Sequence, residues 1–116
     1  MHSSSIQEVN AFLKEMRKVI MLPRQFRMEP RTFDGLAALG LTIPQAKKEI
    51  QTLKFVHYDR GPTPDKIGDD TSIWEFGKPI DDDIVYIKLK LHPKRGCICL
   101  SFKPSTGPFT LPYRNL

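Results

Sequence analysis

Apolar and polar side chains alternate in two neighbouring segments of the chain, Ile84–Leu91 and Cys97–Lys103. The polar positions are Tyr86, Lys88 and Lys90 in the first segment and Cys99, Ser101 and Lys103 in the second. Because alternate side chains of a strand point to opposite faces, each segment predicts a strand with one buried and one polar face. The polar face offers a phenol, ammonium groups and a hydroxyl, which is more chemistry than a solvated face requires.

The alternation restricts how the two strands pair, because a slip of one residue would bury the lysines. On the second strand the buried face is expected to carry Ile98, Leu100 and Phe102. A register with Leu89 opposite Leu100 brings the two apolar faces together. The same register places polar residues opposite each other as Tyr86 with Lys103 and Lys88 with Ser101. Opposed side chains lie about 5 Å apart at Cβ, so each pair can act on one substrate group.

A third strand is predicted at Ile73–Phe76. Burial favours sending Trp74 and Phe76 inward, which leaves Glu75 on the polar face beside Tyr86. A carboxylate, a phenol and ammonium groups suit metal-independent phosphodiester cleavage. That reaction needs a base for the ribose 2′-OH, cations for the charge on phosphorus and an acid for the leaving oxygen.

These requirements assign roles to the residues of the polar face. The predicted catalytic residues are Glu75 as base, Lys88 and Lys103 as cations, and Tyr86 as the group that donates or orients a proton. The predicted substrate-binding residues are Arg60, Lys90 and Ser101, with Arg60 adding a bidentate phosphate contact from a loop. The alternative is a solvated face whose Glu–Lys pairs contribute a few tenths of a kcal/mol each.

No metal site and no cofactor are predicted. Cys97 and Cys99 share a strand face and pair poorly as a disulfide, and no histidine cluster completes a zinc site. The run Asp81–Asp83 lacks the spacing of a calcium loop and indicates a solvated turn. We expect His57 and His92 to be surface or semi-buried side chains.

Helical periodicity precedes these strands. It predicts three helices, over residues 5–21, Thr32–Leu39 and Thr42–Leu53. Capping boxes open the first and third helices, and Gly40 follows the second in a C-cap position. The other segments are predicted as a basic connection over 23–31, a short strand over Phe55–Tyr58, a long loop over Asp59–Thr71, a turn through Gly77–Pro79 and Asp81–Asp83, and an irregular tail over Pro104–Leu116.

The composition is that of one globular domain over residues 1–116. The chain is 40% apolar and 27% charged, with a formal net charge of +5, which favours a polyanionic partner. We predict an α+β fold in which the N-terminal helices pack on one face of a small antiparallel sheet. No apolar run approaches the roughly 20 residues of a membrane span, and the start Met1–Ser5 lacks the features of a secretory signal. A cytoplasmic location is therefore expected.

Three blocks of this sequence resemble the MqsR family of toxins, which are RelE-like messenger-RNA interferases of bacterial and archaeal toxin–antitoxin systems. The blocks are Thr71–Glu75, Ile84–Leu89 and Leu100–Lys103, and the resemblance is clearest between Leu36 and Lys103. It implies an α+β endoribonuclease that cleaves mRNA without a metal and is neutralised by a cognate antitoxin. It leaves open whether the protein forms an oligomer with a second copy or with the antitoxin.

The resemblance also selects individual residues. The family's strand tyrosine falls on Tyr86, and its lysine after the Ser-Phe block falls on Lys103. A family glutamine is replaced here by Glu75. A family lysine after the third helix has no match, with Asp59 or Arg60 nearest, so the base is either Glu75 or one of these loop residues.

Two other function classes remain open from the sequence. A non-catalytic module could bind RNA or an acidic protein through its basic sheet face, with binding that weakens as salt rises. A protein-interaction domain could use the amphipathic helix over residues 5–21 to join a partner or a second copy.

Overall fold

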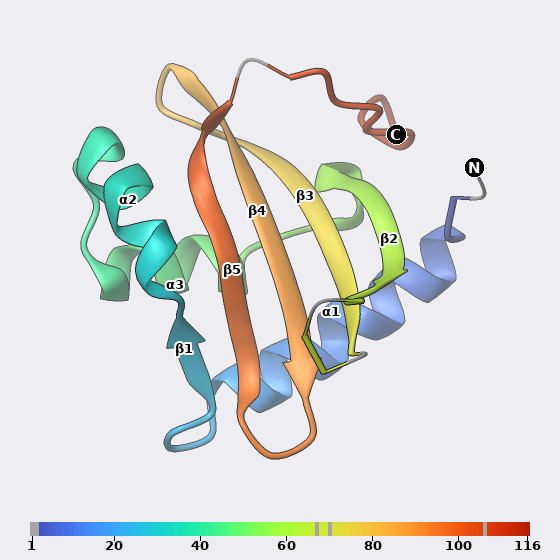
Figure 1. Cartoon of the computed structure of the whole chain (residues 1–116). Helices are drawn as coiled ribbons and strands as arrows, with labels where there is room; N and C mark the ends of the chain where they lie inside the picture. Colours follow the sequence, from blue (N-terminus) through green and yellow to red (C-terminus); the bar gives the residue numbers. More distant parts are fainter. Residues whose placement is uncertain (1–2, 67, 70, 106) are drawn as a thin grey trace.

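The computed structural model describes residues 3–66, 68–69, 71–105 and 107–116, and in these residues three α-helices accompany a five-stranded sheet (Figure 1). The helices are α1 (Ile6–Ile20), α2 (Phe33–Leu39) and α3 (Ile43–Gln51). The strands are β1 (Phe26–Met28), β2 (Tyr58–Pro64), β3 (Ser72–Ile80), β4 (Asp83–His92) and β5 (Gly96–Ser105). Their order in the sheet is β1-β5-β4-β3-β2. The predicted α+β class is confirmed.

Local capping explains where the helices begin and end. The Ser5 hydroxyl accepts a hydrogen bond from the Glu8 amide, and the Glu8 carboxylate accepts one from the Ser5 amide. Thr42 and Gln45 form the same reciprocal pair at α3. Gly40 ends α2 with a φ of 68°, a conformation that favours glycine. All three predicted helices are therefore confirmed, with bounds that differ by at most two residues.

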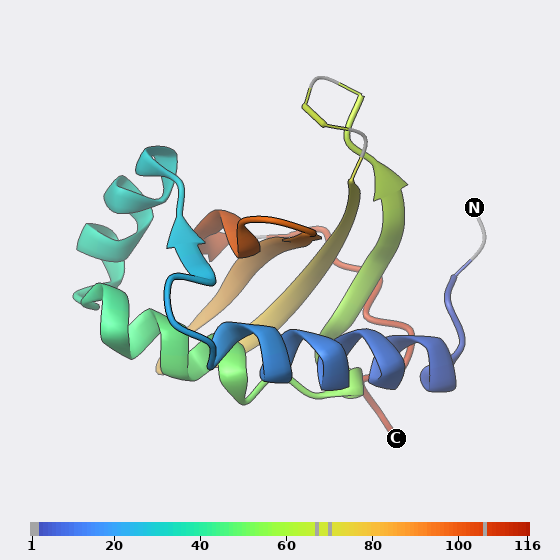
Figure 2. The ribbon, with the colours of Figure 1, turned by 90° about the horizontal axis from the view of Figure 1, so that it is seen from below.

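The helices cover one face of the sheet, as predicted. In Figure 2, α1 and α3 run beneath the strands and α2 lies toward the β5 side. The apolar side of α1 enters the core, where the Phe12 ring stacks on Trp74 with a centroid distance of 4.5 Å. The chain's own sheet therefore occupies the helix face that an interaction domain would offer to a partner. None of the helices in the described ranges is long and apolar enough to cross a membrane.

The sheet is mixed, so the prediction of a purely antiparallel sheet is wrong. Phe26–Met28, predicted as part of a connection, forms β1 and pairs in parallel with β5. Three residues are too few to display a period of two, and the flanking prolines favour a connection, so the sequence pattern does not reveal this strand.

The segment after α3 also differs from the prediction. Phe55–His57 is a 3-10 helix, labelled η2, and the strand β2 begins at Tyr58 and continues to Pro64. Gly61 and Pro62, which indicate a loop, lie where β2 shifts its register against β3. An edge strand tolerates proline because one side of its backbone has no partner strand. Ile67 and Asp70 of the predicted loop lie outside the described residues.

Strands β3 and β5 extend into segments predicted as a turn and a tail. β3 continues through Gly77 and Pro79 to Ile80. This end of β3 pairs with β4 alone, because β2 pairs with β3 only as far as Phe76. The turn is therefore limited to Asp81 and Asp82. β5 takes Pro104 and Ser105 from the predicted tail, and Thr106 lies outside the described residues.

A bulge at Leu100 changes which residues of β5 face the core. Tyr86 pairs with Lys103 and Lys88 with Ser101, as predicted, but Leu89 pairs with Cys99 instead of Leu100. The extra residue reverses the alternation. Cys97 and Cys99 consequently join the core with Phe102, whereas Ile98 and Leu100 form a separate cluster with Ile73. The expectation that Ile98 and Leu100 face the helices is wrong, because a buried thiol packs as well as an aliphatic side chain.

Candidate active site

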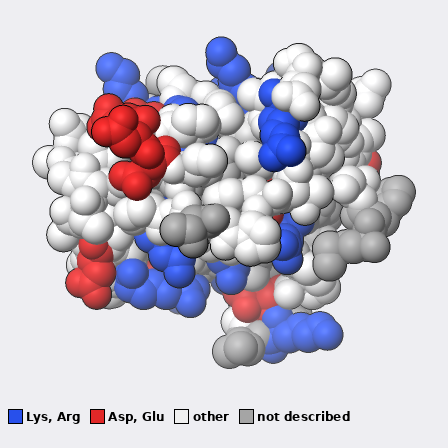
Figure 3. All heavy atoms as spheres, turned by 90° about the horizontal axis from the view of Figure 1, so that it is seen from above, with Lys and Arg blue, Asp and Glu red and all other residues white. Residues whose placement is uncertain are grey.

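The candidate site lies on the sheet face turned away from α1 and α3, which we call the outer face. It carries Glu75, Tyr86, Lys88, Ser101 and Lys103. In the end-on view of Figure 3, basic side chains gather along the lower edge, the side that faces the viewer in Figure 1. Acidic side chains lie among them on the same edge, and a further compact acidic group lies toward the β3–β4 turn. The outer face therefore carries the ammonium groups of Lys88 and Lys103 beside the carboxylate of Glu75.

Tyr86 and Lys103 form the centre of the site. They are direct cross-strand partners on β4 and β5, and Lys103 Nζ lies 5.9 Å from the centroid of the Tyr86 ring. Gly35 of α2 helps to position Lys103, because a Cβ on Gly35 would lie 2.0 Å from the Phe102 carbonyl oxygen and 2.8 Å from Lys103 Cβ. Only glycine allows α2 to approach this end of β5 so closely.

Glu75 completes a contact with Tyr86. The Tyr86 hydroxyl donates a hydrogen bond to Glu75 Oε1, and the Glu75 side chain is 16% exposed. The prediction that Glu75 shares a face with Tyr86 is confirmed, since Trp74 and Phe76 both turn toward the core.

Arg60 approaches the same carboxylate from the other side. It pairs with Glu75 across β2 and β3, and its Nε lies 3.9 Å from Glu75 Oε2 and 3.4 Å from Asp59 Oδ2. Its side chain remains 44% exposed. Arg60 therefore belongs to a strand and not to the predicted loop, and it adds a guanidinium to the site from the sheet edge.

The surroundings hold the Tyr86 phenol in its protonated form. Burial raises the pKa of Tyr86 well above its usual range, and the hydrogen bond to Glu75 together with the negative charge of Glu75 raises it further. Arg60 acts in the opposite direction and does not offset these effects. The phenol therefore stays a hydrogen-bond donor across the physiological pH range.

The sequence suggests Asp59 only as a possible base. In the structure its carboxylate instead contacts the C-terminal segment. Its carboxylate is 3% exposed, and Oδ1 accepts hydrogen bonds from the amides of Thr110 at 2.6 Å and Leu111 at 3.1 Å. Asp59 therefore fastens the C-terminal segment against the start of β2.

This C-terminal segment, residues 107–113, forms one wall of the site. The Phe109 ring packs over Gly77, where a Cβ would lie 2.9 Å from the ring, and its centroid is 6.4 Å from that of Tyr86. The resulting hollow has a volume of about 230 Å³. It is lined by Asp59, Arg60, Glu75, Tyr86, Lys103, Ser105, Gly107, Pro108 and Phe109. Sequence reasoning missed Phe109, because an aperiodic tail gives no sign of where it packs.

Three other predicted residues lie outside this hollow. Lys88 and Ser101 are opposite each other, two residues along each strand from Tyr86 and Lys103 toward the bulge. Lys90 is 8% exposed and donates hydrogen bonds to Asp65 at 3.0 Å and Asp69 at 3.1 Å. The structure therefore places Lys90 in an ion-pair cluster that holds the β2–β3 loop, and not beside Tyr86.

The remaining titratable candidates have structural contacts. His92 Nδ1 accepts hydrogen bonds from the Lys94 and Arg95 amides in the β4–β5 turn. His57 Nδ1 accepts one from the Lys54 amide. Within the described ranges, no three His, Cys, Asp or Glu side chains converge in a group that could hold a metal ion.

No protein-family model, curated protein or solved structure matches the chain. The site geometry and the residue blocks of the sequence are therefore the observations from which a function can be argued.

Proposed function

We propose that the protein is a metal-independent endoribonuclease, a toxin of the MqsR type that cleaves messenger RNA. One observation carries the proposal. A carboxylate held by a phenol lies in one open hollow with a guanidinium and an ammonium group, on Glu75, Tyr86, Arg60 and Lys103. These are the groups that 2′-OH attack on a phosphodiester requires.

The proposed reaction is an internal transfer that needs no water in its first step. Glu75 takes the proton of the 2′-OH, whose oxygen forms a bond to phosphorus while the bond from phosphorus to the 5′ oxygen breaks. Lys103 and Arg60 stabilise the charge that develops on the phosphoryl oxygens. Tyr86 orients Glu75 and gives its proton to the leaving 5′ oxygen, which is a stronger base than a phenolate. The products are a 2′,3′-cyclic phosphate and a 5′-hydroxyl end.

The residue blocks shared with MqsR toxins support the same two central residues. Tyr86 and Lys103 match the family's tyrosine and lysine, and they are also the pair that the sheet register brings together. By the same resemblance we propose a RelE-like fold, action in the cytoplasm and a cognate antitoxin as partner. Growth arrest on expression that a neighbouring gene product relieves would test the partnership.

Cleavage in the presence of EDTA tests the activity directly. Purified protein incubated with a structured mRNA should yield discrete fragments with 5′-hydroxyl ends. Lys103→Ala and Tyr86→Phe should each abolish the fragments, whereas Lys14→Ala, an exposed lysine of α1, should not. Full-length RNA that persists at high protein concentration would overturn the proposal. Salt-sensitive RNA binding without cleavage would instead support the non-catalytic binding module.

A further inference from the structure

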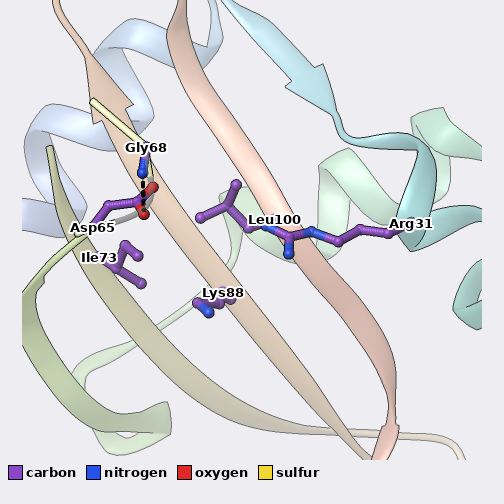
Figure 4. Close-up of a pocket in the computed structure, with 6 residues that line it drawn as sticks. All are labelled: Arg31, Asp65, Gly68, Ile73, Lys88 and Leu100. Atoms are coloured by element: carbon purple, nitrogen blue, oxygen red, sulfur yellow. Dashed lines mark hydrogen bonds between the residues drawn. The ribbon is translucent and has the colours of Figure 1, made fainter. Parts of the chain in front are cut away.

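The outer face has a second hollow next to the candidate site (Figure 4). Its volume is about 250 Å³, and it is lined by Arg31, Asp65, Gly68, Ile73, Lys88 and Leu100. Lys88 lies two residues from Tyr86 on β4 and on the same face, so these two lining residues are about 7 Å apart along the strand. A ligand that occupies the candidate site can continue into this one.

Two cations border the second hollow from different elements. Arg31 extends from the 3-10 helix Pro30–Thr32, labelled η1, across β5 toward Leu100, and Lys88 stands on β4 (Figure 4). Among the ion pairs of the described residues, none involves Arg31 or Lys88. Both groups are therefore available to an anionic ligand.

The carboxylate of Asp65, which lines the hollow, repels an anionic ligand only weakly. Asp65 Oδ2 lies 3.0 Å from Lys90 Nζ, and Asp65 Oδ1 accepts a hydrogen bond from the Gly68 amide at 3.0 Å. The buried Lys90 ammonium thus offsets the charge of this carboxylate, and it also orders the loop that forms one side of the hollow.

Apolar surface lies between the charged groups. Ile73 and Leu100 turn to the outer face, the latter because of the β5 bulge, and they are 7% and 4% exposed. Both side chains line the hollow, where they can contact a base or a ribose but form no hydrogen bonds to base edges. The hollow therefore combines two cations that can bind a phosphate with apolar contacts that do not distinguish one base from another.

We propose that this Arg31–Lys88 subsite binds the nucleotide next to the scissile phosphate of a single-stranded RNA, an inference that rests on the proposed function. Arg31 and Lys88 hold its phosphate, and Ile73 and Leu100 pack against its base or ribose. The bulge at Leu100 is what makes the subsite, because regular alternation would turn this leucine away from Lys88.

Binding of an oligonucleotide that cannot be cleaved separates the subsite from the chemistry. The probe is a short single-stranded RNA with 2′-O-methyl riboses, and its affinity is measured by fluorescence anisotropy at several salt concentrations. Arg31→Gln should weaken binding about tenfold and lower the salt slope by about one. Lys18→Gln removes one charge from exposed α1, on the opposite side of the sheet, and should change affinity less than twofold.

The outcomes distinguish this proposal from the proposed function. If Arg31→Gln binds the probe like the parent protein while the parent cleaves RNA, the subsite is wrong and the nuclease stands. If the parent cleaves no RNA but binds the probe through Arg31, the nuclease fails and the hollow is an RNA-binding site of a non-catalytic module, with no scissile phosphate beside it. Equally tight, Arg31-dependent binding of polyglutamate would identify a protein-docking surface and overturn the subsite.

Discussion

The hydroxyl of Tyr86 donates its hydrogen bond to Oε1 of Glu75, diagonally across β3 and β4. The direct cross-strand partner of Tyr86 is Gly77, which has no side chain to separate the two groups. Oε2 of the same carboxylate faces Arg60 at 3.9 Å. Glu75 is thus held from both sides, and it lines the hollow that Phe109 and Lys103 also border.

Glu75→Gln tests whether this residue is a base or only a positioning group. Glutamine keeps the size and the hydrogen-bond acceptor for Tyr86 but cannot take a proton at neutral pH. We expect kcat for RNA cleavage to fall by about 10²-fold or more, the range of general base catalysis. Single-turnover cleavage, with a thermal unfolding curve as control, measures this. Undiminished cleavage would assign Glu75 a positioning role and leave the base elsewhere.

Asp59→Ala should release the C-terminal segment that forms one wall of the site. It leaves the amides of Thr110 and Leu111 without their buried acceptor, which we expect to cost about 2 kcal/mol of stability. Chymotrypsin should then cleave faster after Phe109, as followed by mass spectrometry. Asp59→Asn is the matched control, because its side-chain oxygen still accepts both hydrogen bonds. Equal cleavage of both variants would show that another contact holds this segment.

The helices and the Tyr86–Lys103 pair could be predicted because their signals are local. Capping boxes lie within four residues, and strand alternation identifies the polar face on which Tyr86, Lys88 and Lys103 lie. The register near Tyr86 follows from the same alternation. These parts of the fold depend on periodicity, which a single sequence displays.

The bulge and the C-terminal wall could not be predicted, for a different reason. At Leu100 the alternation of residue types continues through the bulge, and only packing of Cys97 and Cys99 against the helices decides which face is buried. Asp59 and Phe109 are 50 residues apart in the sequence and meet the site through tertiary contacts without any periodic signal.

His57 should make stability depend on pH. Burial, and to a smaller extent the positive charges of Lys78 and Lys54, lower the pKa of His57 to about 4. The folded state therefore keeps His57 neutral while the unfolded state takes up a proton below its ordinary pKa of 6.5. This contribution is complete above that value and is lost as pH falls toward 4. We expect a loss of about 1 kcal/mol after solvent screening.

His57→Asn supplies the comparison for this loss. The asparagine oxygen can still accept the Lys54 amide hydrogen bond but does not titrate. Urea unfolding of both proteins between neutral and mildly acidic pH should show a smaller loss of stability in the variant. Parallel pH profiles would show that other groups cause the acid sensitivity.

The two thiols should be inert in the folded protein. Cys97 and Cys99 are fully buried beneath the helices, and burial raises the pKa of Cys97 to about 12 and that of Cys99 well above its usual range. Because the thiolate is the reactive form, both groups should resist a disulfide reagent at mildly alkaline pH. Two equivalents should react at once in denaturant.

Arg31→Gln, an exposed change, should leave this protection of the two thiols intact, whereas a deletion of α1 should abolish it. Rapid labelling of the folded parent at either position would contradict the β5 bulge, because regular alternation turns both cysteines to the open outer face.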